Sequence, residues 1–130
     1  MSKESKRILI VDDVKEIVSG ISSILELEGF ETFKAENGVE ALDLIDHSFD
    51  LVISDILMPE MDGIELCQAI KEKYPDIKII LISGGGRQSN VKQSYNYLET
   101  AKKLTGVDTI LKKPFNPEEL VTLINSKLGS

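Results

Sequence analysis

The sequence predicts an α/β protein in which a parallel sheet is covered by helices on both faces. Short apolar runs alternate with segments whose apolar residues recur at helical spacing. Three of the runs, at residues 8–11, 51–53 and 79–82, are apolar throughout, as strands buried on both faces should be. We therefore expect five strands and five helices in a single domain over residues 1–130, with a core from about residue 6 to 128.

The expected elements follow one another in strict alternation. Strands are expected at residues 7–11, 30–35, 50–54, 77–82 and 107–111. Helix-spaced apolar residues lie in the segments between and after them, at Val14 to Leu25, Ala41 to Ile45, Ile64 to Ile70, Val91 to Ala101 and Leu120 to Leu128. Gly29 is expected to end the first helix.

Three of the helix starts share one signature, in which a side chain that can cap a helix stands three residues before a glutamate. The pairs are Asn37 with Glu40, Asp62 with Glu65, and Asn116 with Glu119. Pro117 follows Asn116 at the first helical position, where its missing N–H costs nothing. These signals support helices two, three and five independently of the apolar spacing.

Composition limits the classes of partner and compartment. The 130 residues carry a formal net charge of −7, which predicts no general affinity for nucleic acid or an anionic membrane. Cys67 is the single cysteine, so no disulfide forms within the chain, and the polar start resembles no signal peptide. We expect a cytoplasmic protein.

Polar residues collect where the expected strands end. Asp12 and Asp13 follow the first strand, Asp55 the third, Ser83 the fourth and Lys113 the fifth. In an open α/β sheet, ligands bind beyond the carboxyl ends of the strands, where the strand order reverses. The sequence therefore predicts one shallow site that holds three carboxylates, a hydroxyl and an ammonium group.

The carboxylates of this site predict a metal. Two unit charges 4 Å apart repel by about 4 kcal/mol at an effective dielectric constant near 20. Mg²⁺ prefers oxygen ligands and keeps several waters, so a few carboxylates and an incoming phosphate suit it. A metal-neutralised aspartate can act as a nucleophile and form an acyl phosphate.

At this point four blocks of sequence resemble a known family. They are ILIVDD at 8–13, SDILMP at 54–59 with DG at 62–63, LISG at 81–84 and KPF at 113–115. Together they resemble the response-regulator receiver domain of two-component signalling, in particular the stand-alone chemotaxis type. The resemblance covers about residues 6–128.

The resemblance implies a flavodoxin-like fold with strand order 2-1-3-4-5. It implies a phosphoryl group received on Asp55 from the phosphohistidine of a sensor histidine kinase or a phosphotransfer protein. It also implies a changed binding surface for a downstream protein, and no turnover of a separate substrate, so the chain is expected not to be an enzyme. The implied Mg²⁺ ligands are Asp12, Asp13, Asp55 and the backbone carbonyl of Leu57, and the implied phosphoryl contacts are Ser83 and Lys113.

Two features depart from the family pattern. Ile110 stands three residues before Lys113, where many members carry an aromatic switch residue. The stretch from Ser83 to Lys113 is also several residues longer than usual. We therefore expect the signal to pass through the loop at residues 84–86 and the fourth helix, where Tyr95 and Tyr97 are either exposed or packed.

Several alternatives stay open. Asp13, with Glu16, could simply cap the first helix. A phosphohydrolase with an aspartyl nucleophile would need a second aspartate at Leu57, and a flavodoxin-like electron carrier would need a phosphate-binding loop where Asp12 and Asp13 stand. The chain could also be a receiver domain excised from a longer regulator or hybrid kinase.

Overall fold

The computed structural model describes residues 5–56, 61–83, 109–112 and 115–129. Within them lies a sheet of five parallel strands in the order β2-β1-β3-β4-β5, which confirms the expected fold class and strand order. The strands are β1 (Arg7–Val11), β2 (Glu31–Ala35), β3 (Leu51–Asp55), β4 (Lys78–Ser83) and β5 (Thr109–Lys112).

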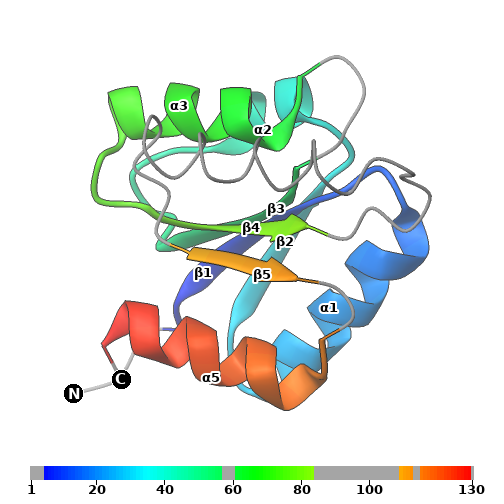
Figure 1. The fold of residues 1–130 in the computed structure, drawn as a ribbon. Coiled ribbons are helices and arrows are strands. Elements are labelled where there is room, and N and C mark those ends of the chain that lie inside the picture. Colours follow the sequence, from blue (N-terminus) through cyan, green and yellow to red (C-terminus); the bar gives the residue numbers. More distant parts are fainter. Residues whose placement is uncertain (1–4, 57–60, 84–108, 113–114, 130) are drawn as a thin grey trace.

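The described helices lie on both faces of this sheet. They are α1 (Lys15–Leu27), α2 (Gly38–Leu44), α3 (Gly63–Lys73) and α5 (Pro117–Leu128). Figure 1 shows α2 and α3 over one face and α1 and α5 over the other. The expected fourth helix, the loop at residues 84–86, Tyr95 and Tyr97 lie outside the described residues.

Two apolar clusters form the core, one on each face of the sheet. Successive side chains of a strand point to opposite faces, so Leu9 and Val11 join one cluster while Ile8 and Ile10 join the other. All four side chains are buried almost completely. The uniformly apolar runs seen in the sequence are therefore strands buried on both faces, as predicted.

The helix ends follow the expected chemistry. Asp62 with Glu65 and Asn116 with Glu119 form complete capping boxes at the starts of α3 and α5. At the end of α1, Gly29 has φ 95°, and the N–H groups of Gly29 and Phe30 donate to the carbonyls of Glu26 and Leu25. This is the left-handed glycine stop that the sequence predicted for the first helix.

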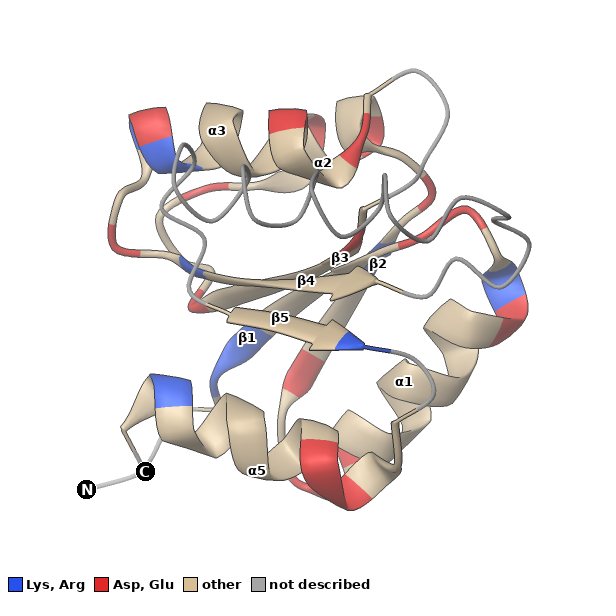
Figure 2. Cartoon of the chain, in the orientation of Figure 1, with Lys and Arg blue, Asp and Glu red and all other residues tan. Residues whose placement is uncertain are grey.

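None of the helices within the described ranges is both long enough and apolar enough to cross a bilayer. Acidic residues are spread over the helices and connecting loops, whereas the carboxyl end of β5 is basic (Figure 2).

Candidate functional site

The carboxyl edge of the sheet brings together the strand ends that carry polar residues. Asp12 and Asp13 directly follow β1, Asp55 is the last residue of β3 and Ser83 is the last residue of β4. Asp55 pairs in register with Ile82, so Ser83 lies one residue further along the same edge. Four of the predicted site residues are therefore found at one edge.

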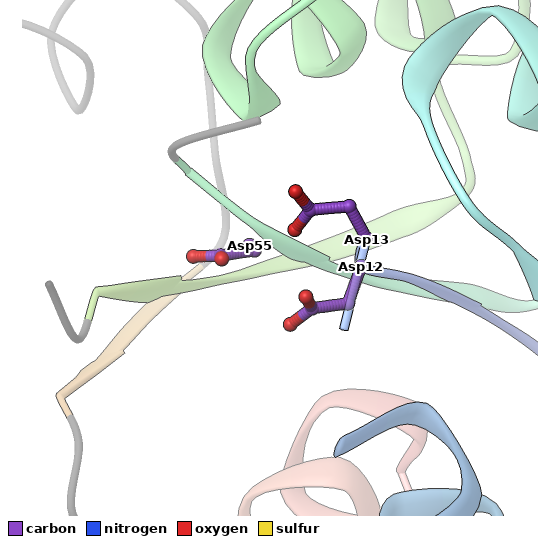
Figure 3. A group of neighbouring side chains, drawn as sticks. All are labelled: Asp12, Asp13 and Asp55. Carbon is purple, nitrogen blue, oxygen red and sulfur yellow. The ribbon is translucent and has the colours of Figure 1, made fainter. Parts of the chain in front are cut away.

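The three aspartates form a compact group. One carboxylate oxygen from each of Asp12, Asp13 and Asp55 lies within 4.8 Å of the others. Asp12 is only 3% exposed, Asp55 is partly buried and Asp13 is exposed, so the group spans the boundary between the core and solvent. Figure 3 shows the carboxylates reaching out beyond the ends of β1 and β3.

Asp12 is held by the backbone around it. Its backbone N–H donates to the carbonyl oxygen of Ala35 at 3.2 Å, which fixes the end of β1 to β2. Its Oδ1 accepts the N–H of Val14 at 2.9 Å, which shapes the turn that leads into α1. The burial of this carboxylate is thus partly compensated by a hydrogen bond.

Asp13 does not cap the first helix. The N-cap residue of α1 is Val14, whose own side chain makes no capping hydrogen bond. The alternative in which Asp13 and Glu16 form a capping pair is therefore wrong. The Asp13 carboxylate instead lies with those of Asp12 and Asp55.

This group fits a hard divalent cation. At about 4.8 Å and an effective dielectric constant near 20, two ionised carboxylates repel by about 3–4 kcal/mol, and solvent screening lowers this value for the pairs that include the exposed Asp13. A cation held by carboxylate oxygens removes this repulsion, and Mg²⁺ needs only one or two carboxylates when phosphate and water complete its shell. Asp12, Asp13 and Asp55 are the residues that could hold it.

Two residues contact the backbone carbonyl of Asp55, and the sequence analysis gave neither a role. The buried Ser54 hydroxyl donates to the carbonyl oxygen of Asp55 at 2.9 Å. Gly63, at the start of α3, approaches the same carbonyl so closely that a Cβ there would lie 2.4 Å from it. The glycine stands in the recognised DG block, but the sequence alone does not show what it touches.

Two predicted site residues, Leu57 and Lys113, lie outside the described residues. Their predicted parts, a backbone carbonyl ligand and a phosphoryl contact, stay predictions. Ile110 is described: it lies in β5, pairs with Leu81 and packs, partly buried, against the core cluster beneath α2 and α3.

A family model and a solved structure both match this chain, and they agree on one family. Residues 8–125 match the family described as the response regulator receiver domain. The fold also matches the crystal structure of a CheY-like response regulator receiver domain protein from Methanospirillum hungatei JF-1. That match has a TM-score of 0.81 and 35% identity, and it covers 97% of this chain and 95% of the other.

Curated relatives are longer proteins. The transcriptional regulatory protein CpxR of Escherichia coli (strain K12) is 38% identical over 122 residues, which are 94% of this chain and 49% of CpxR. The response regulator SaeR of Staphylococcus aureus (strain USA300) is 34% identical over 122 residues, 93% of this chain and 50% of SaeR. The chain spans about half the length of these relatives.

These relatives overturn one expectation about partners. The net charge of −7 suggested that nucleic acid is not among them. A relative named as a transcriptional regulator contradicts that exclusion. The charge was summed over a chain half as long as such a regulator, so it cannot decide what a protein of that length binds.

Proposed function

Because this chain belongs to the family of response regulator receiver domains, we propose that it accepts a phosphoryl group on Asp55 and thereby changes the surface it presents. The single observation that carries the proposal is the group of Asp12, Asp13 and Asp55, with oxygens within 4.8 Å of one another at the carboxyl edge of the sheet. Like charges gathered at a ligand-binding edge are costly, and they favour a site that works with a cation.

Asp55 is the nucleophile in this proposal. It ends a strand whose other residues are buried, and Ser54 holds its carbonyl, so its carboxylate has a defined position at the edge. Asp12 and Asp13 would hold Mg²⁺ beside it, with the carbonyl of Leu57 as a further ligand. When bound, Mg²⁺ neutralises negative charge on the carboxylates and on the incoming phosphoryl oxygens.

The proposed transfer is a substitution at phosphorus. A carboxylate oxygen of Asp55 forms a bond to phosphorus while the bond from phosphorus to the leaving group breaks. That bond is P–N in a phosphohistidine of a sensor kinase and P–O in acetyl phosphate. The leaving group departs with the bonding electron pair, and the histidine nitrogen takes up a proton. Ser83 would donate a hydrogen bond to the transferred group, and Lys113 would balance its charge.

The chain turns over no separate substrate in this proposal. The acyl phosphate on Asp55 is hydrolysed by water, which restores the carboxylate and releases inorganic phosphate. The domain therefore catalyses its own phosphorylation and dephosphorylation, and its output is a conformational signal rather than a product.

Intact mass spectrometry after incubation with acetyl phosphate and Mg²⁺ tests this function. We expect a gain of one phosphoryl group per chain, and we expect Asp55→Asn to prevent it. Asp43→Asn, which removes an exposed carboxylate from α2, is the matched control and should be phosphorylated like the wild type. An equal gain in Asp55→Asn, or no gain in the wild type, would contradict the proposal.

A further inference from the structure

We infer that Gly63 is a positioning residue for Asp55. The first residue of α3 lies against the backbone at the end of β3, and only a residue without a Cβ leaves the Asp55 carboxylate beside those of Asp12 and Asp13. This inference rests on the proposed phosphorylation of Asp55. It adds to the proposed site a residue, Gly63, that carries no reactive group of its own.

The peptide that follows Asp55 is held from two sides. The N–H of Gly63 donates to the carbonyl oxygen of Ile56 at 2.8 Å. The N–H of Ile56 donates to the carbonyl oxygen of Ile82 in β4 at 3.1 Å. The start of α3 and the end of β4 therefore fix the chain immediately after the phosphoacceptor position.

No space for a side chain exists at Gly63. A Cβ there would lie 2.4 Å from the carbonyl oxygen of Asp55, 2.9 Å from the Cα of Ile56 and 3.1 Å from the carbonyl carbon of Asp55. All three atoms belong to the backbone, so no side-chain rotation relieves the contact. Gly63 is not among the glycines with positive φ, so what the position requires is space.

The contact cannot be relieved cheaply by moving α3. The capping box of Asp62 and Glu65 fixes the first turn of this helix. Leu66 and Cys67 on the following turn are buried, at 1% and 0% exposure. A retreat of α3 would open the core and break the Gly63–Ile56 hydrogen bond, so part of the displacement must pass into the Asp55–Ile56 peptide.

A small displacement at this position has a large chemical effect. Mg²⁺ demands near-ideal octahedral geometry at 2.0–2.1 Å, so a shifted Asp55 carboxylate is a poorer ligand. A misplacement of about 1 Å can slow a positioned reaction about 100-fold. A methyl group at Gly63 should therefore weaken metal binding and slow phosphorylation together.

Two other glycines provide matched controls. A Cβ at Gly38, the first residue of α2, would meet three side-chain atoms of Met61, at 2.8, 2.9 and 3.0 Å. Met61 is two residues from Gly63, but its flexible side chain can move without displacing the backbone of Asp55. A Cβ at Gly20, within α1, has nothing within 4 Å.

The test compares Gly63→Ala, Gly38→Ala and Gly20→Ala under conditions where circular dichroism shows each protein fully folded. Two quantities are measured: the Mg²⁺ dissociation constant, and the rate of phosphorylation by acetyl phosphate at saturating Mg²⁺. We expect Gly63→Ala to lower the rate about 10- to 100-fold and to weaken Mg²⁺ binding. The two controls should stay within about threefold of the wild type, because neither displaces Asp55.

The outcomes separate this inference from the proposed function. If the wild type gains no phosphoryl group on Asp55, the proposed function fails. If the wild type is phosphorylated and folded Gly63→Ala matches it in both rate and Mg²⁺ affinity, the positioning role is wrong and the function stands. Equal losses in Gly63→Ala and Gly38→Ala would also overturn the positioning role.

A second variant keeps the test decisive if Gly63→Ala does not fold. Asp62→Ala removes the side chain that accepts the Glu65 N–H at 2.8 Å and so loosens the first turn of α3 without adding bulk. A severalfold loss of rate and Mg²⁺ affinity in this variant would support positioning from α3. Unchanged values would overturn it.

Discussion

At the amino edge of the sheet the Arg7 guanidinium stacks on two aromatic rings and lies beside a carboxylate. At the carboxyl edge three carboxylates gather instead. The Arg7 guanidinium lies over the rings of Phe33 and Phe49, 4.4 and 5.0 Å from their centroids. Its Nη1 is 3.5 Å from a carboxylate oxygen of Glu31, and its backbone N–H donates to Asp50 at 2.8 Å. The carboxyl edge instead holds Asp12, Asp13 and Asp55 within 4.8 Å.

We propose that the amino edge contributes mainly to stability and the carboxyl edge mainly to the chemistry of the site. Stacking and paired charges at the amino edge stabilise the folded chain with no ligand. Like charges at the carboxyl edge repel one another, and a bound cation would relieve that repulsion, as the proposed function requires. Substitutions at the two edges should therefore change stability in opposite directions.

The largest expected effect is at the amino edge. Phe49→Ala should lower the free energy of unfolding by about 3–5 kcal/mol, the range for truncating a buried phenylalanine. Phe49 is 4% exposed, packs edge-to-face on Phe33 at 5.1 Å and supports Arg7. Urea unfolding measures the loss, with Phe49→Leu as the milder control. The folded fraction should still be phosphorylated at the wild-type rate, and a slower rate would show that the edges are coupled.

At the carboxyl edge we expect a substitution to raise the free energy of unfolding rather than lower it. Asp13→Asn removes one of three repelling charges and should stabilise the metal-free protein by about 0.5–1 kcal/mol, a small value because Asp13 is exposed. Urea unfolding in the presence of EDTA measures it. Destabilisation by this substitution would mean that Asp13 makes a favourable interaction in the metal-free state and would contradict the comparison.

Glu16→Gln is the matched control for that prediction. It makes the same change in net charge at another exposed carboxylate, three residues away. Glu16 lies in the first turn of α1, where a negative charge is favourable, so its removal should destabilise slightly. If Asp13→Asn raises the free energy of unfolding and Glu16→Gln lowers it, a general effect of net charge is excluded.

The smallest effect concerns a single carboxylate before β3. Hydrogen bonds from the Ser48 hydroxyl and the Ser48 backbone N–H, with a smaller contribution from Arg7, hold the pKa of Asp46 below its ordinary value. Ser48→Ala removes the first of these, so the pKa should rise towards the ordinary value. A carboxyl titration followed by NMR measures it.

The sign of the accompanying pH effect follows from the lowered pKa. The contribution of Asp46 to stability is present above the pKa of the unfolded chain and is lost as the pH falls through the lower, folded value. Ser48→Ala should therefore show a smaller loss of stability on acidification. An unchanged Asp46 pKa would mean that the hydroxyl bond is unimportant in solution.

The sequence predicts the strands and the polar edge because both depend on local patterns. Fully apolar runs mark strands buried on both faces, and parallel strands end at the same edge, so the sequence alone predicts that Asp12, Asp13 and Asp55 lie together. The caps of α3 and α5 were likewise predictable, because a capping box is set by residues three apart.

Other features depend on contacts between distant segments and could not be predicted. Nothing near Gly63 in the sequence shows that α3 would approach the carbonyl of Asp55, eight positions earlier. The contacts of Arg7 in β1 with Phe33 in β2 and with Phe49 before β3 also join distant segments. The choice between a helix cap and a site residue for Asp13 also needed the backbone, which places Val14 rather than Asp13 at the N-cap of α1.

The most direct test of the central claim is the free energy of unfolding with and without Mg²⁺ at constant ionic strength. At about 10–30 times its dissociation constant, Mg²⁺ should stabilise the wild type by about 1–2 kcal/mol. Asp13→Asn should lose most of this gain, while Glu16→Gln should keep it. Equal gains in all three proteins, or no gain in the wild type, would contradict the account of the carboxyl edge as a cation-dependent site.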